Sequence, residues 1–173
     1  MTTTVSIHDQ TPSSRVGFGG GCHWCTEGVF QALKGVTQVD QGFIQSQAPA
    51  DTWAEGVIVH YDPALISLQT LSEVHLRTHS SNRARSVRSK YRSAIYVIEN
   101  SQRHAAQSAI DGFADESGKA VHTQVLPFAE FKASETRYQN YYQTDPNRPF
   151  CRLYIDPKLD FIRRNFAESA LPR

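Results

Sequence analysis

Long hydrophobic runs and an excess of one charge are both missing from this 173-residue chain. No apolar segment approaches the ~20 residues that a membrane-spanning helix needs. The 18 lysines and arginines nearly balance the 17 aspartates and glutamates, and a net charge of +1 gives no general field for nucleic acid or a membrane surface. Polar residues between Thr2 and Asp9 interrupt any apolar core of a secretory signal. We therefore expect a cytoplasmic protein with neither nucleic-acid nor membrane partners.

Cysteine is also scarce, since the chain has only three. In a reducing compartment structural disulfides are rare, so cysteines there more often have catalytic or redox roles. The length of the chain fits a single domain with one core. We expect residues 1–13, which are polar and end in Thr-Pro-Ser, to form a flexible tail, and residues 14–173 to form a single catalytic domain.

Basic residues gather in only one stretch, between positions 83 and 92. A run of this kind is typical of a solvated face, and a docking patch for an acidic partner is the alternative. Both interpretations place the side chains at the surface. The run consists of Arg83, Arg85, Arg88, Lys90 and Arg92.

Hydrophobic periodicity and turn residues predict alternating strands and helices, the pattern of an α/β or α+β domain. Gly35 is predicted to end the first helix. Ser67 is predicted to cap another helix, whose buried face includes Leu68, Leu71 and Val74. The predicted strands are 15–19, 36–44, 55–61, 93–98 and 121–126, and the other predicted helices are 24–34, 102–113, 134–143 and 157–166.

The segment from Gly19 to Glu27 reads Gly-Gly-Gly-Cys-His-Trp-Cys-Thr-Glu and joins a predicted strand to a predicted helix. Cys22 stands at the helix entrance, where the first backbone N–H groups lack intrahelical partners and act as partial positive charge. A thiolate is stabilised there, so its pKa falls and it becomes nucleophilic near neutral pH. The three glycines leave room for a substrate, which favours a reactive thiol over a small buried hydrophobic residue.

Cys25 completes a Cys-x-x-Cys spacing, which thiol redox proteins use. Two thiols three residues apart in a first helical turn lie close enough for a disulfide. The same spacing is half of a zinc knuckle, with His23 available as a ligand. No second Cys-x-x-Cys exists, and Cys151 is the only distant thiol. We therefore expect no metal site.

Several further motifs occur in the order of one known family. The motif Gly21-Cys22-His23-Trp24 is similar to Gly-Cys-Phe-Trp, and the chain resembles the A-type peptide methionine-sulfoxide reductases over about residues 15–166. The other matching segments are Glu27, Phe30-Gln31, Gly35-Val36, Ala54-Glu55, Val59-His60-Tyr61-Asp62-Pro63, Tyr91-Arg92-Ser93-Ala94-Ile95-Tyr96, and Asp145-Pro146-Asn147 with Cys151.

The resemblance implies an α/β two-layer sandwich, with a central mixed sheet flanked by helices and a ferredoxin-like core. It implies that the Cys22 thiolate attacks the sulfoxide sulfur, that Glu55 protonates the oxygen, and that Tyr91 hydrogen-bonds the same oxygen. Trp24 would line the pocket for the methyl group. The site stands at the strand-to-helix turn that holds Cys22.

The attack would leave methionine and a sulfenic acid on Cys22. A second thiol then condenses with the sulfenic acid, and thioredoxin is the family's usual reductant. Cys151 fits the resolving role by its position in the family, whereas Cys25 fits it by local geometry. The resemblance further implies the S epimer of the sulfoxide as substrate, free or in peptides, and no cofactor. We expect a monomer.

The chain departs from the family pattern around the expected pocket. His23 replaces a phenylalanine that helps form an apolar cage, and its imidazole is a candidate for holding Cys22 as thiolate. The expected substrate-binding tyrosine has no clear counterpart, and Trp53 is the nearest aromatic residue. An expected aspartate falls near Ser86, and the usual His-Asp-Pro reads His79-Ser80-Ser81.

Two other functions stay open at this point. A Cys-x-x-Cys thiol–disulfide exchanger or thiol redox sensor uses the same cysteines without the Glu55 acid. A protein that has lost turnover, and only binds methionine-containing partners, needs neither. Turnover of a sulfoxide epimer identifies the reductase, reduction of insulin disulfides with little effect of Glu55→Gln identifies the exchanger, and binding without turnover that is insensitive to Cys22→Ser identifies the binder.

Overall fold

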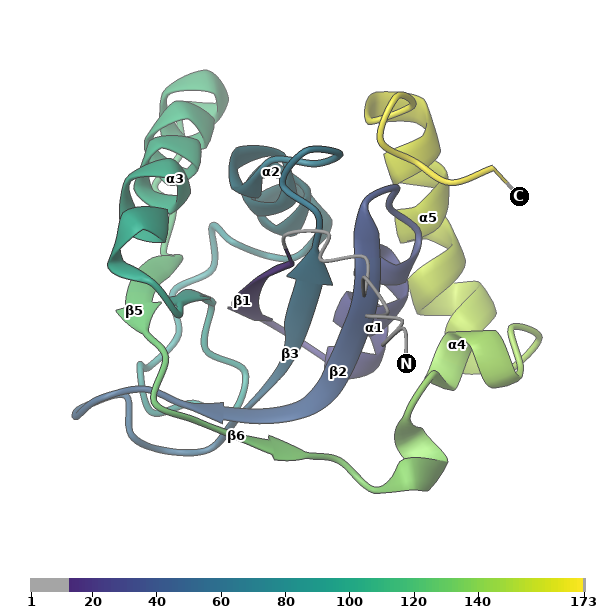
Figure 1. The fold of residues 1–173 in the computed structure, drawn as a ribbon, viewed down its shortest axis with the longest axis horizontal. Helices are drawn as coiled ribbons and strands as arrows, with labels where there is room; N and C mark the ends of the chain where they lie inside the picture. The colour runs from purple at the N-terminus through teal and green to yellow at the C-terminus, as the bar shows by residue number, and fades with distance from the viewer. Residues whose placement is uncertain (1–12, 173) are drawn as a thin grey trace, which may run out of the picture.

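A curled six-stranded mixed sheet organises the computed structural model of the chain, which describes residues 13–172 (Figure 1). The strand order is β5-β4-β1-β3-β2-β6, and only the β4–β5 pair is parallel. The mixed sheet is as predicted, whereas almost all of the predicted tail lies outside the described residues. The strands are β1 (Ser14–Gly19), β2 (Val36–Gln45), β3 (Ala54–Tyr61), β4 (Ala94–Val97), β5 (Gln124–Pro127) and β6 (Glu130–Ala133).

Helices pack against the sheet, so the predicted mixed α/β fold is confirmed. Helix α1 follows β1 and contacts β1, β2 and β3, while α2 follows β3 and packs against α3. In Figure 1, α3 and α5 stand on either side of α2. The helices are α1 (His23–Gln31), α2 (Leu68–Thr78), α3 (Arg103–Ser117), α4 (Tyr141–Thr144) and α5 (Asp156–Asn165), with 3₁₀ turns at Asn100–Gln102 and Thr136–Tyr138 and a π-helical turn at Cys151–Ile155.

Ser67 caps α2 as predicted. Its hydroxyl accepts a hydrogen bond from the Thr70 backbone N–H at 3.0 Å, which satisfies one of the free donors of the first turn. The buried face of the helix contains Leu68, Leu71 and Val74, also as predicted. None of the helices in residues 13–172 is both long and apolar enough to cross a membrane.

The main core lies between the sheet and the helices. Alternate residues of the central strands face it, among them Phe18 of β1, Val57 of β3 and Ile95 of β4, none of them exposed. From α1, Phe30 stacks on Phe18 with 4.5 Å between ring centroids. Each fully buried side chain of this size stabilises the fold by roughly 1.5–3 kcal/mol.

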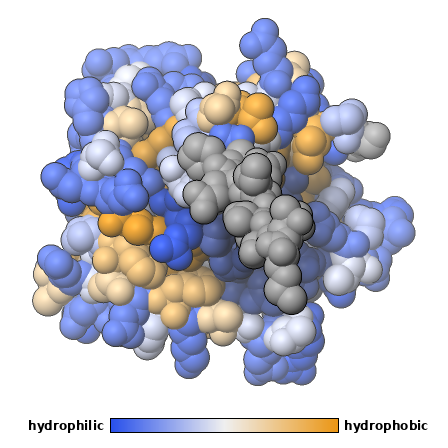
Figure 2. Space-filling model, viewed as in Figure 1, coloured by the Kyte–Doolittle hydropathy of each residue, from blue (hydrophilic) through white to orange (hydrophobic). Residues whose placement is uncertain are grey.

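A smaller apolar cluster lies on the opposite face of the sheet. Its buried members are Ile44, Ile58, Ala94 and Tyr96, and partly buried apolar side chains from 126–131 pack on them. Figure 2 shows hydrophobic surface on this side of the molecule, within a largely hydrophilic surface. Leu126 of β5 and Phe131 of β6 pack on this cluster, so it helps to hold the two edge strands against the central strands.

The predicted helix over 134–143 is wrong. The structure has β6 immediately before this segment, then a 3₁₀ turn and the single turn of α4. Asn140 has a positive φ of 54°, which no continuous helix contains. Backbone groups of this segment instead bond to side chains of α1 and β2, a tertiary arrangement that local periodicity does not encode.

The predicted surface position of the basic run is wrong for Arg92, which is only 2% exposed. Its guanidinium donates hydrogen bonds to the Tyr96 hydroxyl, to the carbonyls of Ile44, Val87 and Thr52, and to the Thr52 hydroxyl. An arginine has five donors, and here they join β2 and two loops to β4. Arg92 is therefore a structural residue.

Candidate active site

Cys22 lies in the tight turn between β1 and α1. Gly20 and Gly21 have φ values of +145° and +81°, which glycine adopts without steric cost. A side chain at position 20 would also lie 2.6 Å from the His79 ring. Cys22 itself is the extended residue before the helix, with φ −69° and ψ 128°. The structure therefore has this cysteine at the strand-to-helix turn, as predicted.

The surroundings of the Cys22 sulfur lower its pKa below the ordinary value of 9.0. The Cys25 thiol has the largest effect because it hydrogen-bonds to this sulfur, and the backbone N–H groups of Trp24 and Cys25 act in the same direction. These N–H groups act as oriented dipoles, since no side-chain capping bond forms there. Burial and the charge of Glu55 oppose the shift. On balance the site favours a thiolate.

Cys25 and Lys158 lie beside Cys22, around the same cavity. The pKa of Cys25 is raised, first by the hydrogen bond to Cys22 and then by burial, while the Lys158 ammonium acts in the opposite direction. Lys158 comes from α5, donates a hydrogen bond to the Thr78 carbonyl, and lines a cavity of about 120 Å³ with both cysteines. Burial lowers the pKa of Lys158, and negative charge on the two sulfurs opposes that shift. No sequence motif pointed to Lys158.

Glu55 and His23 meet beside Cys22. Glu55 in β3 is 8% exposed and His23 in α1 is 7% exposed. The His23 Nε2 atom lies 3.3 Å from Glu55 Oε1, and the His23 backbone N–H donates to the same oxygen at 3.4 Å. The Lys90 Nζ atom lies 3.7 Å from Glu55 Oε2. Glu55 therefore faces the interior next to the predicted nucleophile.

An aromatic cavity of about 280 Å³ opens on the side of His23 and Trp24. Phe43 and Tyr138 complete its aromatic wall. The Trp24 indole stacks on Tyr141 with 4.2 Å between centroids and on Tyr138 with 5.7 Å. The rest of the lining is Lys132, Ala133, Ser134 and Glu135. The ring-lined part of the cavity suits a small apolar group such as the methyl group of methionine.

The sequence did not identify Phe43 or Tyr138 as pocket residues. Phe43 pairs with Glu55 across β2 and β3, a register that becomes visible only once the strands are aligned. Tyr138 belongs to the segment that was predicted as helix. Tyr138 therefore brings a tyrosine ring to the cavity wall from a part of the chain distant from His23 and Phe43.

Glu27 attaches residues 138–141, which we call the tyrosine segment, to α1. This fully buried carboxylate accepts hydrogen bonds from the backbone N–H groups of Asn140 and Tyr141 and from the Gln41 amide. Gln41 also donates to the Tyr138 carbonyl. Burial raises the pKa of Glu27, and these three donors partly offset that effect. Glu27 therefore holds both tyrosines over the first turn of α1.

Tyr91 and Trp53 lie at the margin of the site. The Tyr91 side chain raises the pKa of Lys90 by hydrogen bonding to it, so it reaches Glu55 through Lys90. Its ring also lies under Arg85, 5.9 Å from ring centroid to guanidinium carbon. Trp53 is 38% exposed. Among the residues that the structure describes, neither Tyr91 nor Trp53 lines either of the two cavities.

Cys151 is fully buried and opens the π-helical turn before α5. Its thiol donates to the Asp145 carbonyl at 3.6 Å, and burial raises its pKa. Cys151 belongs to the same apolar cluster as Cys25, and Cys22 packs against that cluster. All three thiols therefore share one region, with Cys22 and Cys25 in direct contact.

Two histidines stack behind the glycine turn, with 4.1 Å between their centroids. His75 bonds to the Gly19 carbonyl at 2.8 Å, and His79 bonds to the Ser93 hydroxyl at 2.7 Å. Burial lowers the pKa of His79 to about 4 and that of His75 well below 6.5, so both rings are neutral at pH 7. Within residues 13–172, no three His, Cys, Asp or Glu side chains are grouped to hold a metal ion.

Comparison with known proteins identifies the family. A family model described as peptide methionine sulfoxide reductase matches residues 14–170. The chain belongs to this family. A peptide methionine sulfoxide reductase MsrA from Sulfolobus acidocaldarius is 33% identical over 166 residues, and the match covers 88% of this chain and 94% of the relative.

Solved structures share the fold of this peptide methionine sulfoxide reductase family member. Reduced Mxr1 from Saccharomyces cerevisiae matches with a TM-score of 0.69 and 17% identity, over 85% of this chain and 93% of that chain. Mxr1 in complex with Trx2 matches with a TM-score of 0.60 and 17% identity, over 82% and 92%. At this identity the likeness supports the mixed α/β fold.

Proposed function

We propose that this chain reduces methionine S-sulfoxide, free or in peptides, with Cys22 as nucleophile and Glu55 as acid. The single observation that carries the proposal is the arrangement of side chains around Cys22. A thiol of lowered pKa stands at a helix entrance near a buried carboxyl, in a member of this family. The two residues that follow it, His23 and Trp24, line the aromatic cavity.

The first step uses the polarity of the sulfoxide. The Cys22 thiolate attacks the electrophilic sulfur, and the acid protonates the oxygen. The bond between that oxygen and the methionine sulfur then breaks, and the oxygen is transferred to the cysteine sulfur. The products are methionine and a Cys22 sulfenic acid. The aromatic cavity lined by Trp24 and Phe43 receives the methyl group. Tyr91 assists through its contact with Lys90 at the edge of the site.

The second step forms a disulfide from the sulfenic acid and releases water. Cys25 is the nearer resolving thiol, because its side chain already contacts Cys22. Once Cys22 is neutral, the hydrogen bond that raises the pKa of Cys25 is lost, whereas the Lys158 charge that favours its thiolate stays. Cys151 is the second resolving thiol, to which the disulfide is passed after it has formed between Cys22 and Cys25. The Mxr1–Trx2 complex supports thioredoxin as the reductant.

Other expectations belong with this proposal. The order β4-β1-β3-β2, with α1 and α2 between the strands, is the basis for a ferredoxin-like core. A cytoplasmic monomer that needs no cofactor stays a prediction, as do the single domain over 14–173 and the contribution of Trp53 to substrate binding.

Turnover with each sulfoxide epimer and dithiothreitol tests the proposal. We expect methionine from the S epimer only, and none from Cys22→Ser. Folded wild-type protein that releases no methionine from either epimer would contradict the proposal.

A second function, general thiol–disulfide exchange, is favoured by the contact between Cys22 and Cys25. Glu55→Gln separates the two functions. The reductase loses activity on the order of 10²–10⁴-fold because its proton donor is gone. An exchanger reduces insulin disulfides at an unchanged rate.

A further inference from the structure

The His23 ring makes one contact that fixes a proton. Its Nδ1 atom lies 2.8 Å from the Gly42 carbonyl oxygen, in β2. A carbonyl oxygen only accepts hydrogen bonds, so Nδ1 must carry the hydrogen. Nε2 therefore points at the Glu55 carboxyl either as a lone pair or as a second N–H.

The second contact favours one more proton. Nε2 and Glu55 Oε1 are 3.3 Å apart, and both residues are buried. An unprotonated nitrogen facing an ionised carboxylate would place two electron pairs against each other, away from water. One proton between the two atoms removes this repulsion, whether it is written as imidazolium with carboxylate or as neutral imidazole with carboxylic acid.

We propose that His23 and Glu55 hold one shared proton and that this pair is the acid of the reaction. His23 is a positioning residue, which keeps the proton at Glu55 Oε1. The inference rests on the proposed function. When the Cys22 thiolate bonds to the sulfoxide sulfur, the oxygen takes the shared proton, which leaves a neutral His23 and a Glu55 carboxylate. The hydroxyl then moves to the Cys22 sulfur, as the sulfur–oxygen bond of the substrate and the new bond between the two sulfurs break. Methionine departs, Cys22 is left as the sulfenic acid, and solvent returns the proton to the pair.

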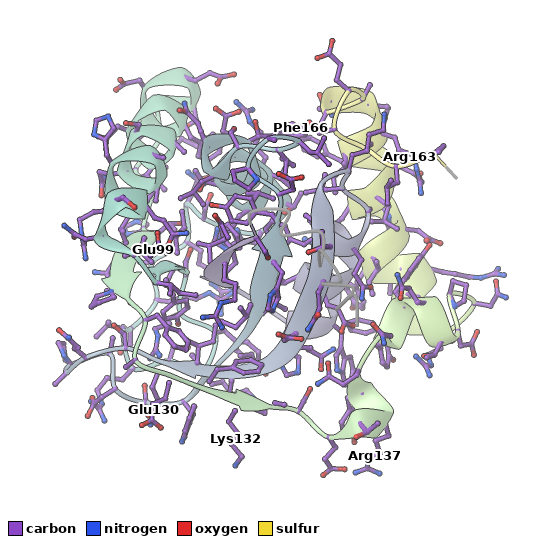
Figure 3. The ribbon with its side chains drawn as sticks, viewed as in Figure 1. Glu99, Glu130, Lys132, Arg137, Arg163 and Phe166 are labelled. Atoms are coloured by element: carbon purple, nitrogen blue, oxygen red, sulfur yellow. The ribbon has the colours of Figure 1, made fainter. Side chains whose placement is uncertain are left out.

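The groups around the pair set the direction of its pH response. Lys90 lies 3.7 Å from the second oxygen of Glu55 and favours the carboxylate. Cys22 faces Glu55 from the helix entrance, and its thiolate favours retention of the proton. Lys132 and Glu135 line the cavity on the outer side of His23, and Figure 3 shows Lys132 extending from β6 at the sheet edge. The His23 ring lies on the other oxygen of the carboxyl, with Nε2 at 3.3 Å from Oε1.

Two substitutions at His23 separate the proton from the shape of the ring. His23→Gln keeps a side chain that donates hydrogen bonds, and His23→Phe keeps an aromatic ring, but neither holds the shared proton. The alkaline limb of kcat/KM should therefore move to lower pH by at least ~1 unit in both variants.

The ratio of variant to wild-type activity is the decisive readout. We expect at least ~10-fold loss at pH 8 and a smaller loss as the pH falls, because a higher proton concentration replaces what His23 supplied. Lys90→Met is the opposite control, because it removes a cation and should move the same limb to higher pH. Equal loss by both His23 variants at every pH would assign His23 a structural role and overturn the proposal.

A spectroscopic measurement checks the proton without turnover. The ¹⁵N chemical shifts of His23 in the reduced protein should show hydrogen on Nδ1 throughout the titration, with Nε2 alone changing. Hydrogen on Nε2 with a bare Nδ1 at high pH would contradict the pair. Wild-type turnover of the S epimer tests the proposed function separately, so an active enzyme with an unchanged pH profile refutes only the shared proton.

Discussion

The side chains of Cys22 and Cys25 interact at the first turn of α1, and the interaction moves their pKa values apart. The pKa of Cys22 is lowered and that of Cys25 is raised, and in both cases the other thiol is the largest cause. In the proposed mechanism, the Cys22 sulfur serves as nucleophile and the Cys25 thiol, kept protonated, donates a hydrogen bond to it. In the same proposal, the two roles exchange when Cys22 is oxidised.

Replacing Cys25 should make Cys22 less acidic. Cys25→Ala removes the main donor to the thiolate, so the pKa of Cys22 rises and its reaction with iodoacetamide at pH 7 slows several-fold. Cys25→Ser keeps a hydroxyl donor and serves as the matched control, with a smaller change. Thiolate absorbance at 240 nm across a pH titration measures the shift. Identical titrations of Cys22 in all three proteins would rule out the donor role.

The first disulfide formed after one turnover should join Cys22 and Cys25. Their contact makes this closure local, whereas Cys151 is buried and its thiol is engaged with Asp145. Quenched single-turnover samples, alkylated and mapped by mass spectrometry, identify the pair. Lys158→Met should slow its formation, because the cation that favours a Cys25 thiolate is removed. An initial Cys22–Cys151 disulfide with Cys25 free would reverse the order.

Glu27→Gln should loosen the tyrosine segment. The carboxylate accepts three hydrogen bonds, and an amide leaves at least one donor facing its own NH₂ group. A buried donor without acceptor costs roughly 1–3 kcal/mol of unfolding free energy. Urea unfolding measures this loss, with Glu168→Gln as an exposed control for the charge change. An unchanged midpoint and an unchanged near-ultraviolet spectrum of Trp24 would show that the segment has other anchors.

Acid should weaken the fold through the stacked histidines. In the unfolded chain these rings gain protons as the pH falls through 6.5, whereas native His79 stays neutral to about 4. The unfolded state therefore binds more protons in this window, and the unfolding free energy falls as pH drops from 6.5 towards 4, by about 3 kcal/mol from His79. Denaturant unfolding at pH 7, 5.5 and 4.5 measures the slope. His79→Gln should show a shallower slope, and equal slopes would exclude this ring as the cause.

The positions of the nucleophile and of most strands followed from local signals. Three glycines before Cys22 mark a turn, and the apolar run Val57-Ile58-Val59 marks a buried strand. Ser67 is a local cap with a local partner. Such features depend on neighbours within a few residues, so the sequence alone carries them.

Other features depend on contacts between distant segments. The tyrosine segment is shaped by Glu27, more than a hundred positions away from Asn140. Arg92 is buried because β2 and the loop that follows it converge on its guanidinium. Lys158 and Phe43 come to the site by packing and strand register, which no single periodicity describes.

A single turnover without added reductant tests the central chemistry most directly. Reduced protein is mixed with excess methionine S-sulfoxide, and the methionine released is counted per chain, while mass spectrometry follows oxygen or disulfide at Cys22. We predict about one methionine per chain in the burst from the sulfenic-acid step, oxidation that includes Cys22, and no burst from Cys22→Ser. A burst of equal size from Cys22→Ser, or one that leaves Cys22 reduced, would contradict the account.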